Sequence, residues 1–257
     1  MPKKKSPRNA ATKTPNPAVQ APLIGSHALT DFRNPFCYLR VMSRAPSLCG
    51  VILAAGESTR MGTDKALLPW RPVPAGQPPR GTFLSAAIES LSRVSEMVIV
   101  VGGKNASRIA PFVFAAGASL AENQQPERGQ FSSLQIGLQE VLNHGRDAAI
   151  VTLVDRPPVH EKTIQHLCLE FYAALERGKW AVVPELGGKH GHPILLGREM
   201  IEKFLKAPAT STARDIEHVY VQQIEYVPVE DPAVAVNINT PDEYAALGAA
   251  TPFVFGL

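Results

Sequence analysis

Short apolar runs and longer stretches of helical periodicity alternate along most of the chain. The runs at about 48–53, 97–101 and 148–154 are continuously apolar, as in strands buried on both faces of a parallel sheet. Between the first two, residues 83–94 repeat apolar side chains at the three- and four-residue spacing of an amphipathic helix. This alternation predicts an α/β fold, with a mostly parallel twisted sheet between two layers of helices.

The same patterns place the remaining elements. Thr82 is the expected cap of the helix over 83–94. The alternation of apolar and polar residues from Val236 to Asn239 predicts a strand before a terminal helix. Further helices are expected over 105–116, 132–143, 160–177, 198–206 and 210–220, further strands over 118–121, 180–184, 194–196 and 224–227, and a glycine-rich loop over 187–193.

Residues 1–45 differ in character from the rest. They are rich in Pro, Ala, Lys, Asn and Thr and show neither a helical nor an alternating pattern of apolar residues. We therefore predict a disordered basic tail before a domain over 46–257. Residues 1–44 contain eight Lys or Arg and one Asp, a net +7, whereas the remaining 18 Lys or Arg and 22 Asp or Glu give −4. A domain of this charge argues against a nucleic-acid partner. Translation from Met42 is an alternative interpretation of the tail.

Composition narrows the class of protein further. Cys37, Cys49 and Cys168 are widely spaced and form no C-x-x-C pair, which favours reduced thiols in a cytoplasmic protein. The basic N-terminus lacks the apolar core of a signal peptide, and no apolar run approaches the roughly 20 residues that cross a bilayer. Residues 71–81 hold four Pro and two Gly, which predicts a surface insertion, with a flexible flap near a ligand site as the alternative.

The first candidate for chemistry follows the first predicted strand, in the stretch VILAAGESTRMGTDKALLPW from Val51 to Trp70. Small residues allow a ligand to approach the backbone, and free N–H groups together with Arg60 and Lys65 suit a polyphosphate. Because no Gly-Lys-Ser/Thr follows Gly62, the stretch is not a P-loop, and it lacks the G-x-G-x-x-G dinucleotide pattern.

Two further polar segments follow predicted strands. Asp155 ends the run at 148–154, where open α/β sheets place their ligand crevice, and its carboxylate is a suitable oxygen ligand for Mg²⁺. The loop at 122–133 has the sequence ENQQPERGQFSS and leads into a helix. A glycine followed by Ser132 and Ser133 at a helix start offers N–H groups and hydroxyls to a ligand, although a plain helix cap is the alternative.

The pattern LAAGxSxRMGxxKxLL resembles the signature of the MobA-like nucleotidyltransferases, and most closely that of MocA-type molybdenum cofactor cytidylyltransferases. The resemblance extends over about 48–248. It implies a Rossmann-like nucleotidyltransferase fold. It also implies a Mg²⁺-dependent transfer of CMP from CTP to a phosphorylated acceptor, with molybdopterin as the favoured acceptor and pyrophosphate as the leaving product.

The resemblance also implies roles for individual residues. Arg60, Lys65 and Asp155 would be catalytic, and Mg²⁺ would bind to Asp155 and Asn237, with Asn239 as the next candidate. The nucleotide would contact the first two cations and the residues Leu53, Ala54, Ala55, Gly56, Asn123, Gly129 and Ser133.

The acceptor side rests on shorter patterns. The resemblance implies that His192, within Gly-His-Pro, shapes the acceptor pocket. Arg214 follows Thr-Ala where molybdopterin transferases have Gly-Ala, so it is a weaker acceptor-site candidate or an ordinary surface residue. The stretch Asn-Ile-Asn at 237–239 replaces the Asp-Ile-Asp of many relatives, which keeps GTP open as the nucleotide.

Three other functions therefore remain. Two keep the same chemistry, with GTP as donor or with a sugar phosphate as acceptor. The third is a protein that binds molybdenum cofactor without catalysis, as a partner or chaperone of a molybdenum enzyme. The presence of all three of Arg60, Lys65 and Asp155 argues for catalysis, because a binding module has no need of the complete set.

Overall fold

The computed structural model describes residues 47–70, 81–208 and 210–249. The predictions of a disordered tail over 1–45 and of a Met42 start lie outside the described residues, as does nearly all of the Pro/Gly segment. The two ends of that segment are held together, since the amide of Trp70 donates to the carbonyl of Gly81 at 2.8 Å.

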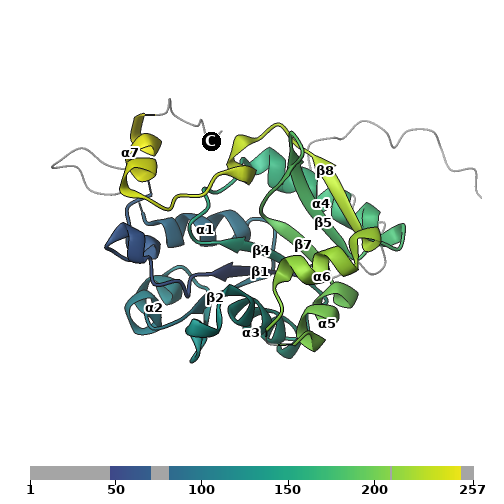
Figure 1. Cartoon of the computed structure of the whole chain (residues 1–257), viewed down its shortest axis with the longest axis horizontal. Helices are drawn as coiled ribbons and strands as arrows, with labels where there is room; N and C mark the ends of the chain where they lie inside the picture. Colours follow the sequence, from purple (N-terminus) through teal and green to yellow (C-terminus); the bar gives the residue numbers. More distant parts are fainter. Residues whose placement is uncertain (1–46, 71–80, 209, 250–257) are drawn as a thin grey trace, which may run out of the picture. The chain divides into compact units, whose positions relative to one another are not determined.

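Eight strands of the described chain form one mixed sheet in the order β3-β2-β1-β4-β7-β5-β6, with β8 paired to β5 (Figure 1). Strands β3, β2, β1 and β4 run parallel, while β7 is antiparallel to both of its neighbours. The strands are β1 (Leu48–Leu53), β2 (Met97–Gly102), β3 (Ser119–Glu122), β4 (Ala148–Leu153), β5 (Ala181–Leu186), β6 (Lys189–His190), β7 (Ile194–Gly197) and β8 (Ile224–Pro228). The predicted α/β class with a mostly parallel sheet is confirmed.

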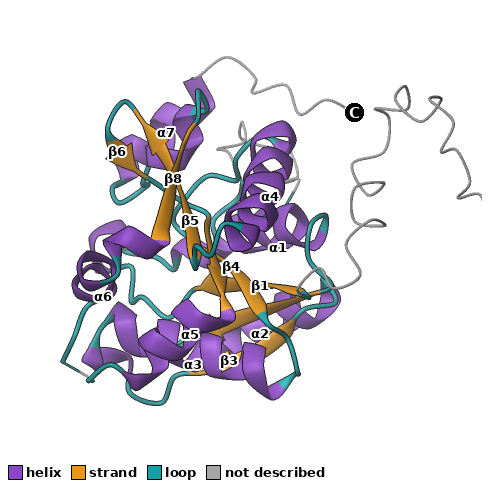
Figure 2. Cartoon of the chain, turned by 90° about the vertical axis from the view of Figure 1, so that its right-hand side faces the viewer, coloured by secondary structure: helices purple, strands orange, loops and turns teal. Residues whose placement is uncertain are grey.

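Helices cover both faces of the sheet, as Figure 2 shows with α1 and α4 on one side and α3 and α5 on the other. They are α1 (Phe83–Ser92), α2 (Ala106–Ala115), α3 (Gln130–Asn143), α4 (Glu161–Glu176), α5 (Arg198–Lys206), α6 (Ala213–Val219) and α7 (Pro241–Ala249). These bounds lie within a few residues of the periodicity-based predictions, because one face of each predicted helix is apolar.

Strand β1 divides the core. Alternate side chains of a strand point to opposite faces of its sheet. Ile52 therefore packs in the same cluster as Leu84 of α1, while Val51 packs in the other cluster with Leu138 of α3, and all four side chains are buried. Two buried faces explain why this run is apolar at nearly every position.

Two helix starts follow the expected capping chemistry. The Thr82 hydroxyl accepts from the Ser85 amide at 3.1 Å, and the Ser85 hydroxyl accepts from the Thr82 amide at 2.7 Å. Thr212 and Asp215 form the same reciprocal arrangement at the start of α6. The prediction that Thr82 caps its helix is thus confirmed.

Two local predictions were wrong. The stretch from Val236 to Asn239 is extended but joins no strand, because it crosses the end of β4, where the Ile238 amide donates to the Asp155 carbonyl at 2.9 Å. The predicted loop at 187–193 contains the short strand β6, paired with β5. Its turn uses Gly187 and Gly188 at positive φ, which brings the chain back sharply enough to pair.

Candidate active site

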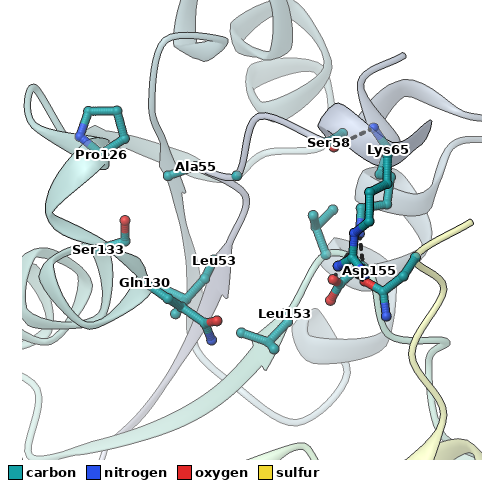
Figure 3. A pocket seen from close by; sticks show the side chains of 14 residues that line it. Leu53, Ala55, Ser58, Lys65, Pro126, Gln130, Ser133, Leu153 and Asp155 are labelled. Atoms are coloured by element: carbon teal, nitrogen blue, oxygen red, sulfur yellow. Dashed lines mark hydrogen bonds and ion pairs between the residues drawn. The ribbon is translucent and has the colours of Figure 1, made fainter. Parts of the chain in front are cut away.

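The parallel strands β1 and β4 end side by side, with Leu53 in register with Leu153. The loops that follow β1, β3 and β4 enclose a cavity of about 250 Å³ at this edge. Its lining is Leu53, Ala55, Gly56, Ser58, Arg60, Lys65, Pro126, Gly129, Gln130, Ser133, Leu153, Val154, Asp155 and Asn239. Figure 3 shows Lys65 and Asp155 on one side of this cavity, with Pro126, Gln130 and Ser133 across from them.

The loop after β1 is held in a defined shape by buried polar contacts. Asp64 is 8% exposed, and its carboxylate accepts from the Ala66 amide at 3.1 Å and from the Asn105 side chain at 3.0 Å. Asn105 also donates to the Ala54 carbonyl at 3.0 Å, which ties both ends of the loop to one side chain. This bracing positions Lys65 and its neighbours before any ligand binds.

Lys65 is the centre of the site. Its ammonium donates to the Asp155 carboxylate at 3.0 Å, to the Ile238 carbonyl at 3.0 Å and to the Asn239 side-chain oxygen at 3.3 Å. The Lys65 side chain is 12% exposed and that of Asp155 is 24% exposed, so this ion pair is partly shielded from water. Three segments far apart in the sequence therefore meet at one nitrogen atom.

The second cation of the signature is more open. Arg60 is exposed, and its guanidinium donates to the same Asn239 oxygen at 3.4 Å. It lines the cavity beside Lys65, so two positive charges border one space. Such a pair can hold a polyphosphate and offset charge that develops on it.

The opposite side of the cavity is built on Asn123, which follows β3. Its amide nitrogen donates to the hydroxyls of Ser132 and Ser133, each at 2.9 Å, and its oxygen accepts from the Gln125 amide at 2.9 Å. The Ser132 hydroxyl in turn donates to the Gly129 carbonyl at 2.7 Å. Ser133 lines the cavity, and its hydroxyl donates to no acceptor among the described residues, so its hydrogen is available to a ligand.

Gly129 gives this loop its shape. It precedes α3 with φ +94°, a conformation that favours glycine, and it lines the cavity together with Gln130 and Ser133 of the first helical turn. The sequence prediction that a ligand meets the chain here therefore has a geometric basis. Gln130 and Pro126 also line the cavity and were missed, because neither residue type signals binding by itself.

The predicted residues do not all reach the cavity. Ala54 is buried in the core and contributes its carbonyl to the loop brace, and Asn123 acts from behind through Ser133. Asn237 is exposed and is not among the lining residues, whereas Asn239 is. The structure thus favours Asn239 over Asn237 as the second oxygen donor, because the buried Ile238 between them turns Asn239 toward Lys65.

The two acceptor-side candidates lie apart from this cavity. Arg214 is exposed on α6. The His192 amide donates to the Val234 carbonyl at 2.9 Å, and its Nδ1 is buried without a hydrogen-bond partner among the described residues. Burial, aided by the Arg156 guanidinium, lowers the pKa of His192 to about 3, so the imidazole is neutral at physiological pH.

A metal at this edge would depend on mixed oxygen donors. Within the described ranges, no group of three or more His, Cys, Asp or Glu side chains is arranged to hold an ion. One carboxylate oxygen of Asp155 accepts a hydrogen bond from Lys65. The other, Oδ1, is buried and has no hydrogen-bond partner among the described residues. Together with the Asn239 amide oxygen, this donor set fits a hard divalent cation that also takes phosphate and water oxygens.

Comparison with known proteins assigns this chain to a family. The model of the MobA-like NTP transferase domain matches residues 50–225, which is more than half of the chain. The chain belongs to this family. The domain that defines the family is an NTP transferase domain, and the matched range contains the loop after β1, the Asn123–Ser133 loop and Asp155.

Individual relatives of this MobA-like chain carry two different activities in their names. A probable molybdenum cofactor guanylyltransferase of Rhodopirellula baltica is 35% identical over 112 residues, which cover 44% of this chain and 50% of the relative. The molybdenum cofactor cytidylyltransferase of Escherichia coli is 22% identical over 197 residues, 76% of this chain and 92% of the relative. The match to the first relative thus spans only half of that protein's length.

Solved structures show the same fold. Rv0371c of Mycobacterium tuberculosis superposes with a TM-score of 0.66 at 25% identity, covering 80% of this chain and all of the other. A structure of Rv0371c with manganese gives a TM-score of 0.63 at 21% identity, over the same shares. Among the helices of the described residues, none combines the length and apolarity needed to cross a membrane.

Proposed function

We propose that this chain transfers a nucleotide from an NTP, with CTP favoured, to a phosphorylated small molecule of the molybdopterin type, in a reaction that depends on Mg²⁺. The observation that carries the proposal is the convergence of Lys65, Arg60, Asp155 and Asn239 on one cavity. The names of the relatives support the acceptor class, and they also support GTP in place of CTP.

Nucleotidyl transfer requires the protein to position the two substrates and to stabilise negative charge on the phosphates. A phosphate oxygen of the acceptor forms a bond to the α-phosphorus of the NTP, and the bond from that phosphorus to the pyrophosphate oxygen breaks. Arg60 and Lys65 would orient the triphosphate and stabilise the charge that grows on the departing pyrophosphate. A divalent cation held by Asp155 and Asn239 would neutralise phosphate charge when bound.

The choice of nucleotide rests on opposing features. The Ala-Ala-Gly loop is the feature that favours CTP, whereas the Asn-Ile-Asn stretch is common to the guanylyltransferase branch. A sugar-phosphate acceptor, a molybdenum-enzyme partner and a non-catalytic cofactor carrier are the remaining alternatives. The last of these conflicts with two cations beside an acidic group, an arrangement suited to phosphate transfer.

The experiment that tests the proposal is a panel of four NTPs with molybdopterin and molybdenum cofactor as acceptors, read as pyrophosphate release with and without Mg²⁺. We expect turnover with CTP, dependent on both the acceptor and Mg²⁺. Turnover with GTP alone would move the assignment to guanylyl transfer. Retained cofactor binding without turnover in any combination would favour the carrier and refute the enzyme.

Adjacent serines at the start of α3 allow a matched test of the nucleotide site. Ser133→Ala removes the hydroxyl that faces the cavity, so we expect the KM for the NTP to rise about 3- to 10-fold with little change in kcat, as for the loss of one hydrogen bond. Ser132→Ala is the control, because the Ser132 hydroxyl already donates to Gly129. Equal KM values for Ser133→Ala and the unmodified chain would contradict the role of Ser133.

A further inference from the structure

The ammonium of Lys65 lies in an oxygen cage with the composition of a metal site. We define this cage by its three oxygens: the Asp155 carboxylate oxygen at 3.0 Å, the Ile238 carbonyl at 3.0 Å and the Asn239 amide oxygen at 3.3 Å. Carboxylate, carbonyl and amide oxygens are the ligands that hard divalent cations take from proteins. The Lys65 ammonium is thus surrounded by oxygens that could coordinate such an ion.

A second observation points to a ligand at the same place. The other carboxylate oxygen of Asp155 is buried and has no hydrogen-bond partner in the described residues. A buried carboxylate oxygen without a partner is unfavourable, so native structures normally supply a donor, a water or an ion. Lys65 satisfies half of this carboxylate and leaves the other half for something else.

We propose that Lys65 occupies the cation position of the nucleotide-free chain and leaves it when a divalent ion enters with the nucleotide. This use of the nucleotide rests on the proposed function, whereas the exchange between ammonium and metal rests on the oxygen cage alone. Two cations at such close range repel each other, so the cage cannot hold both. The flexible four-carbon stem of lysine lets the ammonium move to the phosphates that arrive with the ion.

The exchange has a consequence for the order of binding. A free divalent ion must displace Lys65 from Asp155 without any compensating partner for the ammonium. An ion that arrives with a triphosphate brings such a partner, since the released ammonium pairs with phosphate oxygens. The chain should therefore bind metal weakly by itself and strongly together with nucleotide.

The test measures Mn²⁺ binding by the full chain without nucleotide, from the electron paramagnetic resonance signal of free Mn²⁺. We expect Lys65→Met to bind Mn²⁺ at least about 10-fold more tightly than the unmodified chain, because a competing charge at this range is worth a factor of that order. Adding Asp155→Asn to Lys65→Met should abolish the gain. Unchanged or weaker binding by Lys65→Met would overturn the proposal and make Lys65 a fixed structural anchor.

Two variants separate occupation of the cage from a general effect of charge. Arg60→Met removes an exposed positive charge whose guanidinium donates to one of the three cage oxygens, that of Asn239, at 3.4 Å, so we expect at most about a 2-fold gain. An equal gain from Arg60→Met and Lys65→Met would refute the exchange. Lys65→Arg keeps a cation at the cage and should not bind Mn²⁺ more tightly than the unmodified chain.

Thermal unfolding supplies a second measurement if Lys65→Met is unstable. A ligand that binds the folded state raises the Tm, and tighter binding raises it further at the same Mn²⁺ concentration. Mn²⁺ should therefore raise the Tm of Lys65→Met more than that of the unmodified chain. Because neither measurement uses nucleotide, failure of the NTP panel would refute the proposed function and leave this result to be judged separately.

Discussion

Replacing Asp155 with Asn is expected to lower kcat/KM for nucleotidyl transfer at least about 100-fold, the order seen when a charged contact to the transition state is lost. Asn has nearly the same shape, so Lys65 keeps an oxygen acceptor at the end of β4 and the chain should fold. What disappears is the negative charge that pairs with the Lys65 ammonium and that is available to a divalent ion. Pyrophosphate release measures the effect.

The same strand provides the control for this substitution. Asp147 precedes β4, and Asp155 follows it, so the two carboxylates lie at opposite ends of one strand. Asp147 is half exposed and pairs with Arg198 at 2.8 Å, away from the cavity. Asp147→Asn should leave kcat/KM within about 2-fold, as expected for a surface ion pair. Near-normal activity of Asp155→Asn would remove Asp155 from the catalytic group.

Replacing Gly191 with Ala is expected to destabilise the fold by roughly 2 to 4 kcal/mol, the range for a residue forced into a filled space. An added Cβ would meet the Val234 carbonyl group, lying 2.7 Å from its carbon. The backbone cannot yield as a side chain can, because the Val234 carbonyl also accepts from the His192 amide and from Arg156. The midpoint of thermal unfolding should fall by roughly 5 to 10 °C.

This clash should also reach the active site. Residues 234–239 pass from Gly191 to the Lys65 cage, so displacement of Val234 shifts the segment that carries Asn239. Gly145→Ala is the matched control: Gly145 has φ +68° and open space around its Cβ position, so only the backbone preference is lost, at about 1 kcal/mol. Equal stability of the two variants would show that the Val234 backbone moves away from residue 191 more easily than the geometry indicates.

The elements that the sequence predicts best are those in which every side chain is buried or in which one face alone is buried. The runs at β1, β2 and β4 are apolar because helices cover both sides of those strands, so their periodicity alone predicts buried parallel strands. The reasoning failed at 236–239, where the alternation of Val, Asn, Ile and Asn also suits a strand. There, burial of Ile238 against the end of β4 produces the pattern without any strand partner.

The candidate site divides in a similar way. Arg60, Lys65 and Asp155 could be selected from residue type and position after a strand, because phosphates need cations and divalent ions need carboxylates. Pro126 and Gln130 could not, since their side chains carry no distinguishing chemistry. Asn237 and Asn239 are identical in type and two residues apart, so the sequence could rank them but not decide between them.

By itself, the sequence determined the order of strands and helices, the family and the charged residues that the proposed reaction requires. These features depend on local periodicity and on a signature whose residues are close together in the chain. The tertiary structure decided which oxygens surround Lys65, because Asp155, Ile238 and Asn239 reach it from about 90 and 174 positions away. Such proximity depends on the lateral order of the strands and on the path of the 234–239 segment, which no local pattern encodes.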